Sequence, residues 1–210
     1  MNALQKIRIL LVDDHFFVRI GLRALLEQEA DMEVVGEAGN AREGLVAFRD
    51  FRPDVTLMDG RLPDFHGCEA TAYLTGNFPQ ARVVLLSIDE GEENIQRAVE
   101  AGVFGYLPKC VSRDELLKTI RQVANGRHYF PERIAARLAA RNSREPLSAR
   151  EISVLRYVMK GYINKQIAAE LDIVESTVKA HMGHIMVKLG VPDRTRAVAV
   201  AIERGIFSLE

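Results

Sequence analysis

Ile9-Leu10-Leu11-Val12-Asp13-Asp14-His15 joins a short apolar run to two consecutive carboxylates, and this stretch decides the fold. Three later apolar runs also lead into a polar residue: residues 55–58 precede Asp59, residues 83–86 precede Ser87, and residues 104–107 come just before Lys109. Short apolar runs that alternate with amphipathic stretches predict buried strands and covering helices. The chain therefore begins with an α/β domain.

The strand–helix pattern repeats five times through about residue 126. The predicted strands cover residues 7–12, 33–37, 55–58, 83–86 and 104–107. This repeat predicts a doubly wound, five-stranded parallel sheet with right-handed crossovers and helices on both faces. Only the second strand lacks a singled-out polar residue at its end, which fits the flavodoxin-like order 2-1-3-4-5.

The carboxyl ends of parallel strands meet at one edge, so the polar residues are expected to gather there. Asp13, Asp14 and Asp59 would concentrate enough negative charge to require a cation, and hard oxygen ligands favour Mg²⁺ over zinc. Lys109 and Ser87 could then bind phosphoryl oxygens, with Asp59 as the phosphoryl acceptor. Each of these residues taken alone could equally belong to an ordinary turn or helix cap.

The two parts of the chain differ in charge. Residues 1–130 hold 15 Lys and Arg against 20 Asp and Glu, whereas residues 131–210 hold 13 against 9. An acidic part joined to a basic part suggests that the second meets a polyanion, although two ordinary surfaces would explain the charges as well.

Cysteine usage and hydropathy bear on where the protein works. Cys68 and Cys110 are too few and too far apart for a disulfide framework or a zinc site. No signal-peptide pattern is evident and no stretch has the roughly 20 apolar residues of a membrane span, so we expect a soluble, cytoplasmic protein that does not engage a membrane.

From about residue 127 the pattern changes. Residues 127–146 are predicted to be a linker containing a helical stretch near 131–138, and residues 147–210 an all-α domain. Ser148 and Glu151 have the spacing of a capping box. The expected helices of this domain cover residues 148–159, 164–171, 175–189 and 194–204. The short link between the second and third of them predicts a helix-turn-helix.

The third of these helices has a slender, basic side. It is expected to bury Val178, Ile185 and Leu189 and to expose Thr177, Lys179, Ala180, Gly183 and His184. Such a face can enter the major groove of DNA. A small helical interaction domain with a solvated face is the alternative.

Residues 7–125 resemble the receiver domain of two-component response regulators. The matching residues are Asp13-Asp14, Asp59 with Pro63 and Gly67 downstream, Ser87, Tyr106 and Lys109. The resemblance implies that Asp59 accepts a phosphoryl group from a sensor histidine kinase. It also implies that Asp13, Asp14, Asp59 and the backbone carbonyl of Arg61 hold Mg²⁺, and that Ser87 and Tyr106 form a switch pair.

Residues 147–207 resemble the LuxR-type DNA-binding domain. The motif comprises Leu147-Ser148-x-Arg150-Glu151, Gly161-x-x-Asn164-Lys165-x-Ile167-Ala168, Ser176-Thr177-Val178-Lys179-x-His181 and Lys188-Leu189-Gly190-Val191-x-x-Arg194-Thr195-x-Ala197. By resemblance, Lys179, Ala180 and Gly183 face bases. The residues that would approach phosphates are Asn164, Lys165, Thr177, Lys188 and Arg194. The last helix would pair two domains as a homodimer on double-stranded DNA.

Together the two parts resemble a response regulator of the NarL/FixJ class, with a receiver over 1–126, a linker over 127–146 and the DNA-binding domain over 147–210. The predicted function is phosphorylation-dependent control of transcription, not enzymatic turnover. Two alternatives remain open: a Mg²⁺-dependent phosphohydrolase that uses Asp59 as nucleophile, and a DNA-binding protein whose receiver signals without phosphate. The absence of a second aspartate close after Asp59 counts against the phosphohydrolase.

Overall fold

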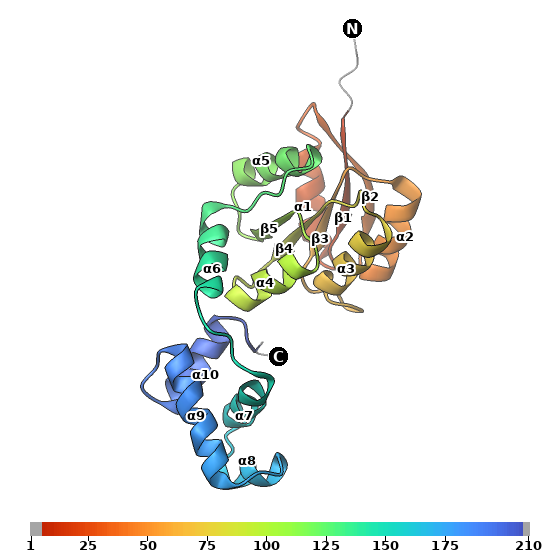
Figure 1. The fold of residues 1–210 in the computed structure, drawn as a ribbon. Helices are drawn as coiled ribbons and strands as arrows, with labels where there is room; N and C mark the ends of the chain where they lie inside the picture. Colours follow the sequence, from red (N-terminus) through yellow and green to blue (C-terminus); the bar gives the residue numbers. More distant parts are fainter. Residues whose placement is uncertain (1–5, 208–210) are drawn as a thin grey trace. The chain divides into compact units, whose positions relative to one another are not determined.

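A computed structural model describes residues 6–207 (Figure 1). The chain divides into two compact units. Of the described residues, 6–90 and 95–136 belong to the first unit, and 91–94 and 137–207 to the second. The first unit is an α/β domain and the second is helical.

One parallel sheet organises the first unit. Its strands are β1 Ile7–Val12, β2 Met32–Ala38, β3 Val55–Asp59, β4 Val83–Ser87 and β5 Gly105–Pro108. Their order is β2-β1-β3-β4-β5, with every neighbouring pair parallel. This confirms the predicted flavodoxin-like order, and the predicted strand limits differ from the observed ones by one residue at most.

Five helices cover this sheet: α1 Phe16–Leu26, α2 Ala41–Phe51, α3 Gly67–Asn77, α4 Glu92–Glu100 and α5 Arg113–Ala124. Figure 1 shows α1 and α5 on one face and α2, α3 and α4 on the other. Alternation along β1 explains both layers: Ile9 and Leu11 pack with Leu26 and Ile120 on the first face, whereas Val12 lies against Gly44 of α2.

Helix α6 Glu132–Asn142 lies within the predicted linker. The chain leading into it is tied to the first unit, because Tyr129 forms a parallel bridge with Gly105 and the ring of His128 stacks on Phe104. Ile134 of α6 is fully buried. The start of the predicted linker is thus part of a folded domain.

The second unit contains α7 Ala149–Met159, α8 Asn164–Glu170, α9 Glu175–Leu189 and α10 Arg194–Glu203. Residues 137–207 contain no strand. The helices share a core that includes Leu155, Ile167, Val178, Ile185 and Ala197. The predicted helix-turn-helix is present as α8 and α9.

The predicted capping box holds the start of α7. Ser148 Oγ accepts from the Glu151 amide at 3.2 Å, and the Ser148 amide donates to Glu151 Oε2 at 2.7 Å. Lys188 Nζ from α9 lies 3.0 Å from the same carboxylate. Burial alone would raise the pKa of Glu151, but the Ser148 hydrogen bonds and the Lys188 ammonium lower it below its ordinary value of 4.5.

Glu151→Gln is therefore expected to weaken the second unit in a pH-dependent way. The folded-state pKa is depressed, so the carboxylate contributes stability that is complete above pH 4.5 and is lost as the pH falls through the folded value. We expect the glutamine variant to lose about 1–2 kcal/mol near pH 7 and to show a flatter acid dependence. Urea unfolding at several pH values, followed through NMR amide signals of α7 and α9, measures the stability loss and its pH dependence. Parallel pH profiles for the wild type and the variant would show that the Glu151 carboxylate does not contribute in this way.

Candidate functional site

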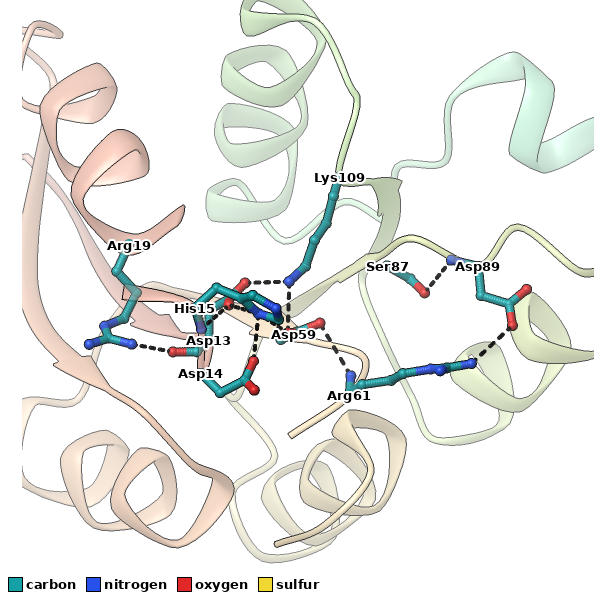
Figure 2. A network of polar contacts seen from close by, with 9 residues as sticks. All are labelled: Asp13, Asp14, His15, Arg19, Asp59, Arg61, Ser87, Asp89 and Lys109. Atoms are coloured by element: carbon teal, nitrogen blue, oxygen red, sulfur yellow. Dashed lines mark hydrogen bonds and ion pairs between the residues drawn. The ribbon is translucent and has the colours of Figure 1, made fainter. Parts of the chain in front are cut away.

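The predicted polar residues gather at the carboxyl edge of the sheet (Figure 2). Asp13 and Asp14 follow β1, Asp59 ends β3 and Lys109 follows β5. Asp13 and Asp59 are buried, at 1% and 3% exposure, whereas Asp14 is exposed. The structure brings Asp13, Asp59 and Lys109 into direct contact, as the parallel strands require.

Lys109 connects the two buried carboxylates. Its Nζ lies 2.7 Å from Asp13 Oδ2 and 2.7 Å from Asp59 Oδ2. Burial alone would lower the pKa of Lys109, but its hydrogen bonds to Asp13 and Asp59 raise the pKa overall. The ammonium therefore stays charged and offsets part of the buried negative charge.

Asp59 is held from two sides. Its Oδ2 contacts Lys109, and its Oδ1 accepts from the Arg61 amide at 3.2 Å. Burial raises the pKa of Asp59 although both contacts act to lower it. Gly67 lets α3 begin against this strand, because a Cβ there would lie 2.1 Å from the Asp59 carbonyl oxygen.

A divalent cation fits this cluster. One ligand atom each from Asp13, Asp14, His15 and Asp59 lies within 4.8 Å of the others. Three carboxylates offer the hard oxygen atoms that divalent cations prefer. Arg61, whose carbonyl is implied as a further ligand, lies two residues beyond Asp59 in the loop that leads to α3.

Sequence reasoning missed His15 at this site. His15 Nδ1 lies 2.7 Å from Asp14 Oδ1 and 3.1 Å from Asp13 Oδ1. Its position directly after the acidic pair was the available signal. A residue at a strand end can point toward the carboxylates or away from them, so the sequence alone did not place the ring.

Ser87 ends β4, the strand next to that of Asp59, and it shares a partner with Tyr106 of β5. Ser87 Oγ accepts from the Asp89 amide at 3.0 Å, and the Tyr106 hydroxyl donates to the Asp89 carbonyl. The Tyr106 side chain is 1% exposed, so it points inward. Burial raises the pKa of Tyr106 to about 12, which keeps the phenol neutral.

Some of the residues predicted to face DNA are exposed on helix α9. Lys179, Ala180 and His184 are exposed. Thr177 and Gly183 were also predicted to be exposed, but they are half-buried, because both lie at the margin of the buried stripe. Val178, Ile185 and Leu189 are buried as predicted.

The residues expected to contact phosphates differ in exposure and in their contacts within the domain. Lys165 is exposed and Asn164 is half-buried at the start of α8. Lys188 Nζ lies 2.8 Å from Glu145 and 3.0 Å from Glu151, and Arg194 donates to the Tyr162 carbonyl at 2.8 Å. Lys188 and Arg194 thus hold the domain together in this structure.

Comparisons with known proteins agree with this geometry. Residues 9–121 match the family model described as response regulator receiver domain, and residues 145–201 match that of bacterial regulatory proteins of the luxR family. The chain belongs to the two-component response regulators that carry a LuxR-type DNA-binding domain. This family consists of transcription regulators and not of enzymes, which removes the phosphohydrolase alternative.

Relatives of known name cover almost the whole chain. The response regulator protein VraR of Staphylococcus aureus is 34% identical over 96% of this chain and 99% of its own. The crystal structure of the response regulator ChrA of a heme-sensing two-component system is 37% identical, with a TM-score of 0.57, and the match covers 97% of this chain and all of ChrA. RcsB from Salmonella enterica serovar Typhimurium, solved bound to promoter DNA, shares the fold at 22% identity and a TM-score of 0.73, over 95% of this chain and 99% of RcsB.

None of the helices over residues 6–207 combines the length and the apolar character needed to cross a membrane.

Proposed function

We propose that Asp59 accepts a phosphoryl group from a sensor histidine kinase and that the phosphorylated chain binds double-stranded DNA as a homodimer to control transcription in the cytoplasm. The observation that carries the proposal is the contact of buried Asp59 with Lys109 beside two further carboxylates. We assign the receiver to residues 1–126, the linker to 127–146 and the DNA-binding domain to 147–210, with the first part of the linker packed on the receiver.

Each residue of the site has its own role in the phosphoryl-transfer step. An Asp59 carboxylate oxygen forms the new P–O bond while the P–N bond of the phosphohistidine donor breaks and the departing imidazole keeps the electron pair. Lys109 moves from the carboxylate to a phosphoryl oxygen, and the Ser87 hydroxyl donates to another. Mg²⁺ held by Asp13, Asp14, Asp59 and the Arg61 carbonyl would neutralise charge on the transferring group.

The switch pair links this site to the loop after β4. Ser87 and Tyr106 both contact the backbone of Asp89. A hydrogen bond from Ser87 to the phosphoryl group would favour one arrangement of this loop, and the inward Tyr106 fills the space beside it. Phosphorylation therefore biases a two-state surface of the receiver.

DNA recognition is assigned to α9. The exposed Lys179 and Ala180 lie on its N-terminal half, where a helix-turn-helix reads base edges. Pairing of two domains through α10 would place two such helices on neighbouring half-sites, and the linkage of two weak contacts raises affinity. RcsB, which shares the fold, was solved bound to promoter DNA in the presence of a phosphomimetic, and this supports DNA binding by the present chain.

A DNA-binding assay under phosphorylation tests the proposal. An oligonucleotide is selected from a random library with the wild-type chain, and its affinity is measured by fluorescence anisotropy with Mg²⁺, with and without phosphoramidate. We expect affinity to rise by about 5–150-fold with the donor, and the rise to disappear when EDTA removes Mg²⁺. Equal affinity in all three conditions would contradict phosphorylation control.

Lys179→Ala and Lys165→Ala are expected to weaken DNA binding in different ways. If Lys179 reads a base, its truncation should cost about 1–3 kcal/mol of binding free energy and relax the preference for that base. A phosphate-contacting Lys165 weakens binding to all sequences and lowers the slope of log affinity against log salt by about 1. Titrations against the selected site and point-substituted sites at several salt concentrations separate the two, and identical profiles for both variants would refute the assigned roles.

A further inference from the structure

His15 adds an imidazole nitrogen to a site otherwise made of carboxylates. Its Nδ1 lies 2.7 Å from Asp14 Oδ1, 3.1 Å from Asp13 Oδ1 and 3.9 Å from Asp59 Oδ2. The nitrogen thus faces all three acidic side chains at once (Figure 2). Such a position is the one that a ligand of a shared cation would take.

The spacing supports this reading. Adjacent ligands of an octahedral ion with bonds of about 2.1 Å lie about 3 Å apart. The separations of Nδ1 from the Asp14 and Asp13 oxygens, 2.7 and 3.1 Å, match that spacing. No large movement is needed to convert this hydrogen-bonded group into a coordination sphere.

The surroundings leave the imidazole available. Its side chain is 64% exposed, so the ring hydrogen can move to Nε2 when a cation binds, which frees the Nδ1 lone pair for the metal. His15 precedes α1, and its side chain makes no capping hydrogen bond there. The start of α1 therefore does not use this side chain as a cap, which leaves a ligand role open.

We propose that His15 Nδ1 is a direct ligand of the divalent cation and shifts the selectivity of the site from Mg²⁺ toward Mn²⁺ and later first-row transition ions. The inference rests on the proposed cation site of Asp13, Asp14 and Asp59. Mg²⁺ binds oxygen and gains little from a nitrogen ligand, whereas imidazole suits transition ions. One residue would thus set which metal supports phosphorylation.

Mn²⁺ provides a direct probe in the full-length chain. Its affinity is measured from the free-ion EPR signal, Mg²⁺ affinity is measured by competition, and electron spin echo modulation of bound Mn²⁺ reports a coordinated ¹⁴N. The variants are His15→Ala, Asp13→Asn and, as a matched control at the same sheet edge, the exposed His66→Ala.

We expect imidazole ¹⁴N modulation in the wild type and in His66→Ala, and none in His15→Ala. His15→Ala should weaken Mn²⁺ at least about tenfold and change Mg²⁺ less than about threefold. If Asp13→Asn abolishes Mn²⁺ binding but the wild type shows no such modulation, or His15→Ala retains it, the His15 inference is wrong and the cation site stands. If Asp13→Asn leaves Mn²⁺ binding unchanged, the cation site is wrong and the inference falls with it.

Discussion

Asp59→Asn is expected to abolish the rise in DNA affinity that a small-molecule phosphodonor produces in the wild type. The asparagine keeps the shape of the side chain and an acceptor for the Arg61 amide, but its amide is not a nucleophile for phosphorus. The expected loss is the entire rise of about 5–150-fold, whereas binding without the donor should change little. Fluorescence anisotropy with the selected oligonucleotide measures this.

Asp64→Asn is the matched control, since Asp64 lies between β3 and α3 as well, and its carboxylate accepts from the Ala41 and Arg42 amides at the start of α2. It should respond to the donor as the wild type does. A wild-type response preserved in Asp59→Asn would place the phosphoryl acceptor at another residue. No response to the donor in either protein would favour the alternative in which the receiver signals without phosphate.

Lys109→Met is expected to have the second large effect, on stability as well as on signalling. Removal of the ammonium leaves Asp13 and Asp59 buried next to each other without their shared positive charge. A buried group left without its partner costs several kcal/mol, and the partial exposure of Lys109 places the expected loss at about 2–3 kcal/mol in the absence of divalent cations. Partial protonation of the raised-pKa Asp59 limits the loss at low pH.

Millimolar Mg²⁺ should restore much of that stability, because a cation replaces the missing charge. Urea unfolding by circular dichroism, with Mg²⁺ and with EDTA, measures the loss and the recovery. Lys6→Met, at an exposed lysine before β1, is the control and should change neither. A Lys109→Met variant as stable as the wild type in EDTA would show that the ammonium does not balance the two carboxylates.

Much of the fold followed from local sequence features. The apolar runs that end at Asp13, Asp59, Ser87 and Lys109 predicted the strand order, because parallel strands must bring such ends to one edge. The capping box of Ser148 and Glu151 was equally readable, since it depends on residues three apart in sequence.

Features that depend on tertiary packing could not be predicted from local sequence. The pattern near residue 131 predicted a helix, but not that Tyr129 pairs with β5 and Ile134 is buried. The resemblance to the LuxR-type domain implies that Lys188 approaches a phosphate, yet in the fold its ammonium lies between Glu145 and Glu151. The side chain of His15 could likewise have pointed to solvent, and only the packed strand end directs it to the carboxylates.

Mass spectrometry of the intact chain after incubation with Mg²⁺ and phosphoramidate, followed by mapping of the modified peptide, tests the central claim most directly. The predicted result is a gain of one phosphoryl group located at Asp59 and absent from Asp59→Asn. No gain in the wild type, or the same gain in Asp59→Asn, would contradict the assignment of Asp59 as the phosphoryl acceptor.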